Sequence, residues 1–413
     1  MMKRLLKHMI RDGALEIEDA AGKVMTVGDA SIPACRIKLH KKTLEWSLLL
    51  NPPVKLAEAY MDGSLTVEKG DIGDLTEIMA KNYSRLENHW LAKPVFHLNR
   101  QSRWIKQYNP IGKAQRNVAH HYDLSGRLYD LFLDRDRQYS CAYFEEEHGD
   151  LERAQLDKKR HIAAKLLLNE AGLRLLDIGS GWGGMGLYLA SLASARVVGV
   201  TLSEEQHRLS RERAEQAGLA DRVDFRLQDY RTLAERFERI VSVGMFEHVG
   251  KKNYREFFGK LRGLLTENGV CLLHTIARFN EPGPINPFIR KYIFPGADLP
   301  TLSELLPAIE DNGLFVTDIE ILRLHYAETL KLWRQRFNEN HRAVEDLYDA
   351  RFYRMWELYL AGCEMGFRHQ GLMVVQVQMT RRQETLPLTR DYMFDWERAQ
   401  AVRDARGRPQ ATK

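Results

Sequence analysis

The sequence predicts an α/β protein with a mostly parallel sheet over most of its length. From about residue 120 onward, short apolar runs typical of strands alternate with helical patterns. A glycine-rich turn follows one of these runs and leads into a helical pattern. Strands that alternate with helices pair in parallel and carry helices on both faces of the sheet, so these observations predict that architecture.

Each element has its own signal. Apolar runs bounded by turn residues predict strands. Ser203, with Gln206 three residues later, predicts the start of one helix through a capping box. The predicted strands are 173–179, 195–201, 222–228, 239–245, 269–277 and 372–380, and the predicted helices are 203–218, 253–265 and long patterns within 326–368.

Composition divides the chain into three parts. Residues 1 to about 85 mix short strand and helix patterns with Asn-Pro-Pro and Asp-Gly turns. Together with the basic segment that follows, they are predicted to form a smaller α+β domain over residues 1–115. Residues 116–385 hold the alternating pattern and are predicted to form the main domain. Residues 386–413 are predicted to be a polar tail, with a disordered composition at its end.

Composition also excludes several classes of protein. No apolar run approaches the ~18–20 residues that a membrane-spanning helix needs. Cys35, Cys141, Cys271 and Cys363 lie far apart, which argues against a disulfide framework or a zinc site and suits a reducing cytoplasm. The net charge of +5 is too small by itself to indicate a nucleic-acid partner.

One segment is far more basic than the chain as a whole. Residues 93–116 carry six Lys or Arg and no acidic residue, with Phe96, Trp104 and Tyr108 interleaved. Cations with amphipathic rings suit an anionic lipid surface. A solvated linker has the same composition, and single-stranded nucleic acid also requires cations and stacking rings.

The turn LLDIGSGWGG is typical of a nucleotide site. Gly179, Gly181 and Gly183 let the backbone turn tightly and approach a ligand, and Asp177 ends the strand where such sheets bind ligands. With Gly184 the spacing also satisfies GxGxxG, but a dinucleotide needs an acidic residue about 20 positions later. The next strand ends in VVGVTLS, without one. The turn therefore favours S-adenosylmethionine over NAD or a purely structural turn.

Several motifs together resemble one family. They are QYSCAYF, LLDIGSGWGG, VVGVTLSEEQ, RIVSVGMFEHVGKKNY, LLHTI, KYIFPGADLP and HYAETLKLWRQRF. The chain is similar in these motifs to the cyclopropane-fatty-acid-phospholipid synthases and the mycolic acid cyclopropane synthases, strongly over 115–385 and loosely before. The resemblance implies a seven-stranded, Rossmann-like class I methyltransferase fold with helical insertions over an acyl channel. Ser180 stands where the family usually has cysteine; we expect little effect, because backbone geometry decides the turn.

The resemblance also implies a cofactor site for S-adenosylmethionine. Tyr139 and Ser140 match positions that touch the cofactor, and a tyrosine face attracts a sulfonium. The polar edges and ring of LQDY suit adenine, although Asp229 alone is more often a turn residue. The predicted set is Tyr139, Ser140, Asp177, Gly179, Ser180, Gly181, Trp182, Gly183, Thr201, Leu202, Ser203, Gln206, Gln228, Asp229 and Tyr230.

The implied reaction transfers a methyl group from the sulfonium to a carbon–carbon double bond. The alkene is a poor nucleophile, so positioning must supply much of the rate, and the resulting carbocation must be kept from water. A base then takes a proton from the added methyl group and the ring closes.

The resemblance implies that this base is bound bicarbonate. His274 and the Tyr326 hydroxyl would donate hydrogen bonds to it, as would the Ile276 backbone N–H and the Cys141 N–H or thiol. Glu247 would accept the proton of its hydroxyl. Each residue also has a structural reading as packing or a satisfied core group, but Glu247 and His274 both fall at carboxyl ends of predicted strands.

The two cysteines in the matching motifs could also act covalently. Cys363 matches a cysteine position of the family within a helical pattern and belongs to the predicted catalytic set. A covalent role would need a thiol pKa depressed by a cation or a helix N-terminus. Packing or lining the acyl channel suits Cys363 better, and no base stands beside Cys141 in the sequence.

Together these observations predict a cytoplasmic enzyme that associates peripherally with membranes. It would add a methylene group across a cis double bond of an unsaturated phospholipid acyl chain, using no metal, and a homodimer is possible. One alternative transfers a methyl group without closing the ring. Two others are a non-catalytic sensor and an NAD-dependent oxidoreductase. Head group, double-bond position and oligomeric state are not determined by the sequence.

Overall fold

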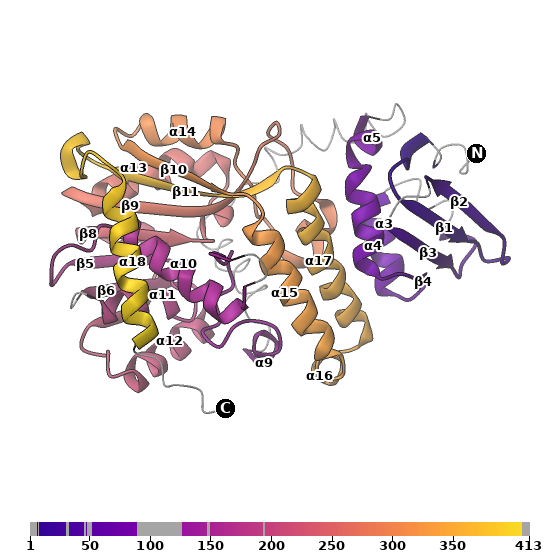
Figure 1. The fold of residues 1–413 in the computed structure, drawn as a ribbon, viewed down its shortest axis with the longest axis horizontal. Coiled ribbons are helices and arrows are strands. Elements are labelled where there is room, and N and C mark those ends of the chain that lie inside the picture. Colours follow the sequence, from indigo (N-terminus) through magenta and orange to yellow (C-terminus); the bar gives the residue numbers. More distant parts are fainter. Residues whose placement is uncertain are drawn as a thin grey trace.

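Two β-sheets organise the structure. The computed structural model describes residues 6, 8–29, 33–44, 47, 52–88, 126–146, 149–192 and 195–406. The smaller sheet lies at one end of the molecule and the larger sheet at the other, with α15 and α17 between them (Figure 1). The predicted basic segment 93–116 lies outside the described residues.

The N-terminal unit is α+β, as predicted. Its strands pair in the order β2-β1-β3-β4, with β1 parallel to β3 and the other pairs antiparallel. Helices α3 and α4 pack against α17 of the larger unit (Figure 1). The elements are β1 (Ala14–Glu18), β2 (Val24–Gly28), β3 (Ala34–Leu39), α3 (Pro52–Met61), β4 (Leu65–Lys69), α4 (Ile72–Lys81) and α5 (Tyr83–Asn88).

The larger sheet has seven strands in the order β10-β11-β9-β8-β5-β6-β7. All neighbours from β9 to β7 are parallel, and β11 is antiparallel to both β9 and β10. The sequence predicted all of these strands except β10, a half-exposed strand. They are β5 (Arg174–Ile178), β6 (Arg196–Thr201), β7 (Val223–Leu227), β8 (Phe237–Val243), β9 (Leu265–Arg278), β10 (Phe315–Leu322) and β11 (Leu372–Thr380).

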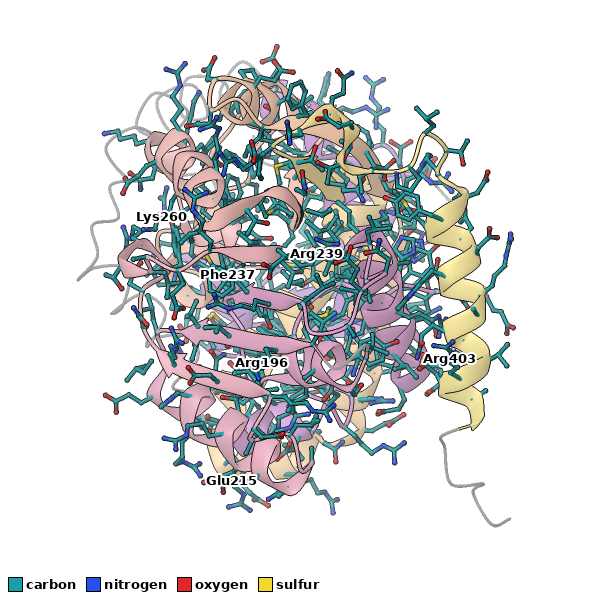
Figure 2. All side chains as sticks on the ribbon, turned by 90° about the vertical axis from the view of Figure 1, so that its left-hand side faces the viewer. Arg196, Glu215, Phe237, Arg239, Lys260 and Arg403 are labelled. Atoms are coloured by element: carbon teal, nitrogen blue, oxygen red, sulfur yellow. The ribbon has the colours of Figure 1, made fainter. Side chains whose placement is uncertain are left out.

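Helices cover both faces of this sheet. Figure 2 looks along it from the side, with Arg196 on β6, Phe237 and Arg239 on β8, and α18 along one flank. The helices are α9 (Gly126–Asp130), α10 (Leu151–Lys165), α11 (Gly184–Ser191), α12 (Glu204–Gln216), α13 (Tyr254–Leu264), α14 (Leu302–Glu310), α15 (His325–Glu339), α16 (His341–Leu347), α17 (Ala350–His369) and α18 (Asp391–Arg406).

Helix α18 occupies most of the predicted polar tail, so the disorder expected for the terminal residues 403–413 is wrong for residues 403–406. The helix packs against α10. Glu397 of α18 contacts His161 at 3.0 Å, and Asp404 accepts a hydrogen bond from Tyr188 at 3.1 Å. These polar contacts add to the apolar packing of the helix, in which Met393 is buried and Trp396 lies against the core. Nowhere in the described chain is a helix long and apolar enough to cross a membrane.

Candidate active site

The sheet reverses its order of winding between β5 and β8. From β5 the chain continues to β6 and β7 on one side, and then returns to β8 and β9 on the other. In open α/β sheets, ligands bind at such a switch point beyond the carboxyl ends of the strands. The glycine turn follows β5 at this position.

The turn requires glycine for two separate reasons. Gly179, Gly181 and Gly183 all have positive φ, at +81°, +54° and +84°, which glycine adopts without strain. A Cβ on Gly179 would also lie 2.7 Å from the Met245 side chain. At Gly181 a Cβ would meet nothing within 4 Å. The turn is therefore tight on one side and open on the other.

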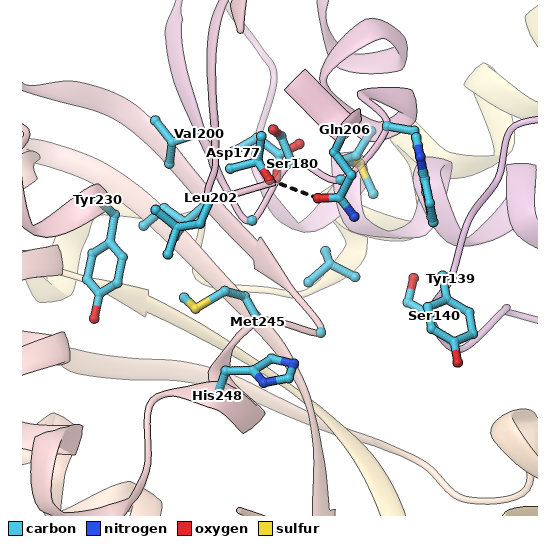
Figure 3. Close-up of a pocket in the computed structure, with 18 of the residues that line it drawn as sticks. Tyr139, Ser140, Asp177, Ser180, Val200, Leu202, Gln206, Tyr230, Met245 and His248 are labelled. Carbon is cyan, nitrogen blue, oxygen red and sulfur yellow. Dashed lines mark hydrogen bonds between the residues drawn. The ribbon is translucent and has the colours of Figure 1, made fainter. Parts of the chain in front are cut away.

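A pocket opens beside this turn (Figure 3). In Figure 3, Tyr139 and Ser140 lie on one side of it, and Tyr230 lies at the opposite end beyond Leu202. Of the predicted cofactor residues, only Gly183 and Ser203 do not line it. Those that do are Tyr139, Ser140, Asp177, Gly179, Ser180, Gly181, Trp182, Thr201, Leu202, Gln206, Gln228, Asp229 and Tyr230.

Two buried polar atoms beside the pocket lack a partner within the described chain. They are Asp177 Oδ2 and Ser180 Oγ. Burial raises the pKa of Asp177 to about 7, although Lys158 and the Gly186 N–H act against the rise. A buried acceptor without a donor costs free energy, and such atoms are rare in folded proteins. Their position fits a ligand that brings hydrogen-bond donors and positive charge.

The start of α12 forms the next part of the wall. Ser203 caps the helix as predicted, accepting a hydrogen bond from the Gln206 N–H. The capping-box part of that prediction is wrong, because the Gln206 side chain instead accepts from Thr201 Oγ1 at 2.8 Å. This contact holds Gln206 against the pocket (Figure 3). Ser203 thus acts on the site through the helix start, without lining it.

The segment 137–140 forms the opposite wall, and α10 holds it at residues 138 and 140. The Lys158 ammonium donates to Gln138 Oε1 and to Ser140 Oγ, both at 2.8 Å. The Gln155 amide donates to the carbonyl oxygens of Gln138 and Ser140, at 3.2 and 3.0 Å. Lys158 is fully buried, and burial lowers its pKa to about 8. None of the ion pairs in the described chain includes it, but Asp134, Asp136 and Asp177 lie close enough to interact with its charge.

Aromatic rings surround Tyr139 on its other sides. Its ring lies 5.4 Å from Tyr129 and 5.2 Å from Trp333, and its hydroxyl lies 2.8 Å from that of Tyr359. Trp333 is fully buried. This wall keeps water from the region between the pocket and α15.

Glu247 belongs to a short 3₁₀ turn, Phe246–His248, just after β8. Strand β8 ends at Val243, level with His274, whereas β9 continues to Arg278. The Ile276 N–H therefore has no β8 partner and donates to Glu247 Oε1 at 2.7 Å. The expectation that this N–H is available to an anion is wrong here, because it positions Glu247 instead.

The second oxygen of this carboxyl group, Glu247 Oε2, is buried without a hydrogen-bond partner in the described chain. Burial raises the pKa of Glu247, although hydrogen bonds from backbone groups and Thr275 oppose the rise. Burial raises the pKa of Tyr326 well above its usual value, and Tyr359, Cys141, Glu247 and Cys363, in that order, add to the rise. The Tyr326 hydroxyl therefore lies near these four groups. Four of the predicted catalytic residues therefore lie close together.

Both cysteines of this group are protonated thiols. Burial raises the pKa of Cys363 to about 12 and that of Cys141 further. The Cys141 thiol donates to its neighbour's carbonyl, Ala142 O, at 3.3 Å. A nucleophilic cysteine needs a depressed pKa, so this environment disfavours covalent chemistry at either thiol.

His274 lies inside β9, not at the end of a strand as the sequence indicated. It stands directly opposite Gln376 of β11, whose Nε2 lies 3.1 Å from His274 Nδ1. Burial, followed by the charges of Lys158, Lys165 and His161, lowers the pKa of His274 well below its usual value. The imidazole is therefore neutral at physiological pH.

Comparison with known proteins decides the family. A sequence profile described as mycolic acid cyclopropane synthetase matches residues 111–377. The chain belongs to this family. A domain of unknown function matches residues 1–90.

Family relatives extend over most of the chain. A probable fatty acid methyltransferase of Pseudomonas putida is 38% identical over 82% of this chain and 86% of its own length. A cyclopropane-fatty-acyl-phospholipid synthase of Escherichia coli strain K12 is 38% identical over 79% of this chain and 82% of its own.

A solved structure shares the fold. Mycolic acid cyclopropane synthase CmaA1, complexed with SAH and CTAB, superposes with a TM-score of 0.62 at 34% identity, over 66% of this chain and 99% of that one. The larger unit is thus a class I S-adenosylmethionine-dependent methyltransferase of the cyclopropane-synthase kind, as the motifs implied.

The sequence missed several residues around the site. Met245 and His248 line the pocket (Figure 3), and burial lowers the pKa of His248 to about 4. Met245 and His248 lie within the quoted motif RIVSVGMFEHVG, so that motif could have indicated them. Lys158 and Gln155 had no such signal, because the charge-rich α10 reads as a surface helix.

Proposed function

We propose that this member of the family transfers a methylene group from S-adenosylmethionine to a cis double bond of a phospholipid acyl chain. The product is a cyclopropane fatty acid, and bound bicarbonate acts as the base. The Escherichia coli relative carries the name of this activity. The observation that carries the proposal is the buried, unpartnered Glu247 Oε2 beside Tyr326, next to a pocket whose residues fit the cosubstrate.

The cosubstrate would occupy the pocket of Figure 3. When bound there it supplies an activated methyl group on a sulfonium. Asp177 and Ser180 would accept hydrogen bonds from it, since both have buried oxygens without donors. The space beside Gly181 would let the cosubstrate approach the backbone of the turn. Tyr139 offers a ring close to the positive charge.

The double bond would lie between the pocket and the group formed by Glu247, Tyr326 and His274. Positioning dominates here because the alkene is weakly nucleophilic. The methyl group's bond to sulfur breaks as its bond to one alkene carbon forms, which leaves a cation on the other carbon. The rings around Tyr139 exclude water from this cation.

The ring closes when the added methyl group loses a proton. Glu247 Oε2 is suited to accept the hydroxyl proton of a bicarbonate ion, which fixes the ion's orientation. The Tyr326 hydroxyl and the His274 imidazole would donate to its other oxygens. Lys158 contributes a buried positive charge close enough to affect both Cys141 and His274. This charge favours an anion beside an acidic side chain.

Lipid docking forms part of the same proposal. The segment 93–116 carries the cations and rings for an anionic membrane surface, with the enzyme in the cytoplasm and peripherally bound. Cosedimentation with anionic vesicles should fall steeply as salt is raised, and charge reversal at Arg100, Arg103 and Lys106 should abolish it. Unchanged binding would contradict this role. A homodimer would double the docking surface.

The decisive experiment uses vesicles of cis-monounsaturated phospholipid and methyl-¹³C-labelled S-adenosylmethionine, with bicarbonate or in CO₂-free buffer. We expect labelled, upfield cyclopropane proton signals that depend on bicarbonate. Label in the lipid without upfield signals would instead indicate methylation without ring closure. No label transfer in either buffer would overturn the proposed function.

A further inference from the structure

A line of buried hydrogen bonds reaches His274 from the side away from Glu247. Gln376, opposite His274 on the neighbouring strand, lies with Nε2 3.1 Å from His274 Nδ1. The Lys165 ammonium donates to Gln376 Oε1 at 2.7 Å. Lys165 in turn contacts Glu320 and lies 3.9 Å from Asp318. His274, Gln376 and Lys165 are all at most 2% exposed.

The chemistry of these groups fixes the direction of every hydrogen bond. An ammonium group only donates, so the atom of Gln376 that faces Lys165 must be its carbonyl oxygen. The amide nitrogen of Gln376 then faces His274, and an amide nitrogen also only donates. Nδ1 of His274 must therefore accept. A neutral imidazole that accepts at Nδ1 carries its proton at Nε2.

We propose that Gln376 and Lys165 are positioning residues that hold His274 as the neutral Nε2–H tautomer, so that Nε2 can only donate. Protonation of Nδ1 would set two donors face to face across 3.1 Å. No acceptor for Nε2 exists among the described residues, which leaves this donor for a bound group. That the group is the anionic base rests on the proposed function; the tautomer itself does not.

A fixed neutral donor has a chemical advantage at this site. An imidazolium beside the base would offer it a proton and reduce its capacity to take one from the methyl group. The other tautomer would present a lone pair toward an anion. The Nε2–H form stabilises the anion without neutralising it. In other proteins, too, a hydrogen bond to one ring nitrogen of a catalytic or metal-bound histidine fixes the role of the other nitrogen.

The Lys165 anchor is itself held in place from several elements. Its carbonyl oxygen accepts from Gln378 Nε2 at 2.5 Å. Glu320 Oε2 accepts from His161 Nε2 at 2.6 Å, and His161 Nδ1 lies 3.0 Å from Glu397 of α18. These contacts keep the ammonium at Gln376 Oε1, so the amide cannot turn over.

Selective ¹⁵N-histidine labelling tests the tautomer directly. NMR spectra that correlate the imidazole nitrogens with the carbon-bound protons of the ring distinguish the two neutral tautomers and the imidazolium. The His274→Gln variant identifies the His274 signals. We expect the Nε2–H form in the intact protein from pH 6 to 8. An Nδ1–H form or an imidazolium over this range would overturn the proposal, whatever the enzyme proves to catalyse.

Substitution then links the tautomer to activity. Gln376→Glu keeps a partner for Lys165 but presents an acceptor to Nδ1, so His274 should gain a proton there. We expect kcat to fall about 10- to 100-fold, with the KM for the cosubstrate within about twofold. Lys165→Met should produce a mixture of tautomers and an intermediate loss.

Thr380 provides the matched control for a structural effect. It is a buried polar residue on the same strand and the same face, four residues along, and its hydroxyl donates to Arg382 O, away from Lys165 and His274. Gln376→Met should disturb the His274 signals and lower kcat, whereas Thr380→Val should leave both unchanged at a similar loss of thermal stability. Equal effects of the two substitutions, or a changed tautomer at Gln376→Glu with wild-type kcat, would refute the positioning role.

Discussion

Two carboxyl groups show how individual residues carry the function. Asp177 and Glu247 are both buried, and each has one oxygen without a hydrogen-bond partner in the described chain. Neither arrangement stabilises the fold, because desolvation penalises each charge. Groups that break the rules of stable packing are expected at functional sites. These two residues lie where the cosubstrate and the base are proposed to bind.

Substitutions at Glu247 and Cys141 should show which of these two neighbouring residues the reaction depends on. Glu247→Gln can still accept from Ile276 N–H through its carbonyl oxygen, but places an amide donor where Oε2 lacks a partner. We expect kcat to fall by about 10²-fold or more, on the scale of losing one preorganised polar group. Cys141→Ser should retain at least about a tenth of wild-type activity in the labelled-vesicle assay. Complete inactivity of folded Cys141→Ser would restore the nucleophile hypothesis.

Asp177 makes a prediction about stability and pH. Its pKa is raised to about 7, so between pH 4 and 7 the folded state binds a proton that the unfolded state has lost. Stability therefore falls as pH rises through this window and stays reduced above it. Asp177→Asn should raise the melting temperature at pH 8 and weaken binding of S-adenosylhomocysteine, measured by calorimetry. A variant that binds as tightly as the wild type would exclude Asp177 from the cosubstrate site.

At the scale of elements, the sequence predicted the parallel core better than its surroundings. Strands β5 and β9 contain apolar runs, at 175–176 and 270–273, because both of their faces are buried there. Strand β10 is half-exposed and lacks that signal. Helix α10 is rich in Lys and Arg, yet most of it is buried. Its charges are satisfied by tertiary partners, which a single sequence does not reveal.

For the same reason the contacts of the candidate site were only partly predictable. The motifs placed Glu247, Ile276 and His274 in one region. They did not show that β8 stops short of the level of Ile276 on the neighbouring strand β9. The Ile276 N–H is therefore left to donate to Glu247. They also could not show that Gln376 stands opposite His274, because strand register is a property of the assembled sheet.

Helix α10 should act on cosubstrate binding through Lys158. Lys158→Met removes a buried cation together with its bonds to Gln138 and Ser140, so one pocket wall loses its support. Two hydrogen bonds to a charged donor are worth about 1.5–3 kcal/mol each, not all of which reaches the ligand. We expect the Kd of S-adenosylhomocysteine to rise about 10-fold, by calorimetry. An unchanged Kd would show that the wall is held by Gln155 alone.

At the scale of the whole molecule, the C-terminal helix is connected to the active site without touching the pocket. No residue of α18 lines the pocket. Its Glu397 nevertheless contacts His161, which contacts Glu320, which holds Lys165. The region that looked like a polar tail thus supports the far end of the line of hydrogen bonds that orients His274.

Removal of α18 should therefore affect turnover more than binding. A chain ending after Arg390 should lose thermal stability and kcat, while its Kd for S-adenosylhomocysteine stays within about threefold of the wild-type value.

The substitution Glu397→Gln tests the contact between α18 and His161 alone. Burial lowers the pKa of His161, but hydrogen bonds to Glu320 and Glu397 outweigh this and raise it overall. A raised histidine pKa stabilises the fold at low pH, and this contribution is lost as pH rises through the folded-state value. The melting temperature of Glu397→Gln should thus fall further below wild type at pH 6 than at pH 9. An equal difference at both pH values would mean that His161 is neutral in the fold and that α18 acts only as a cover for α10.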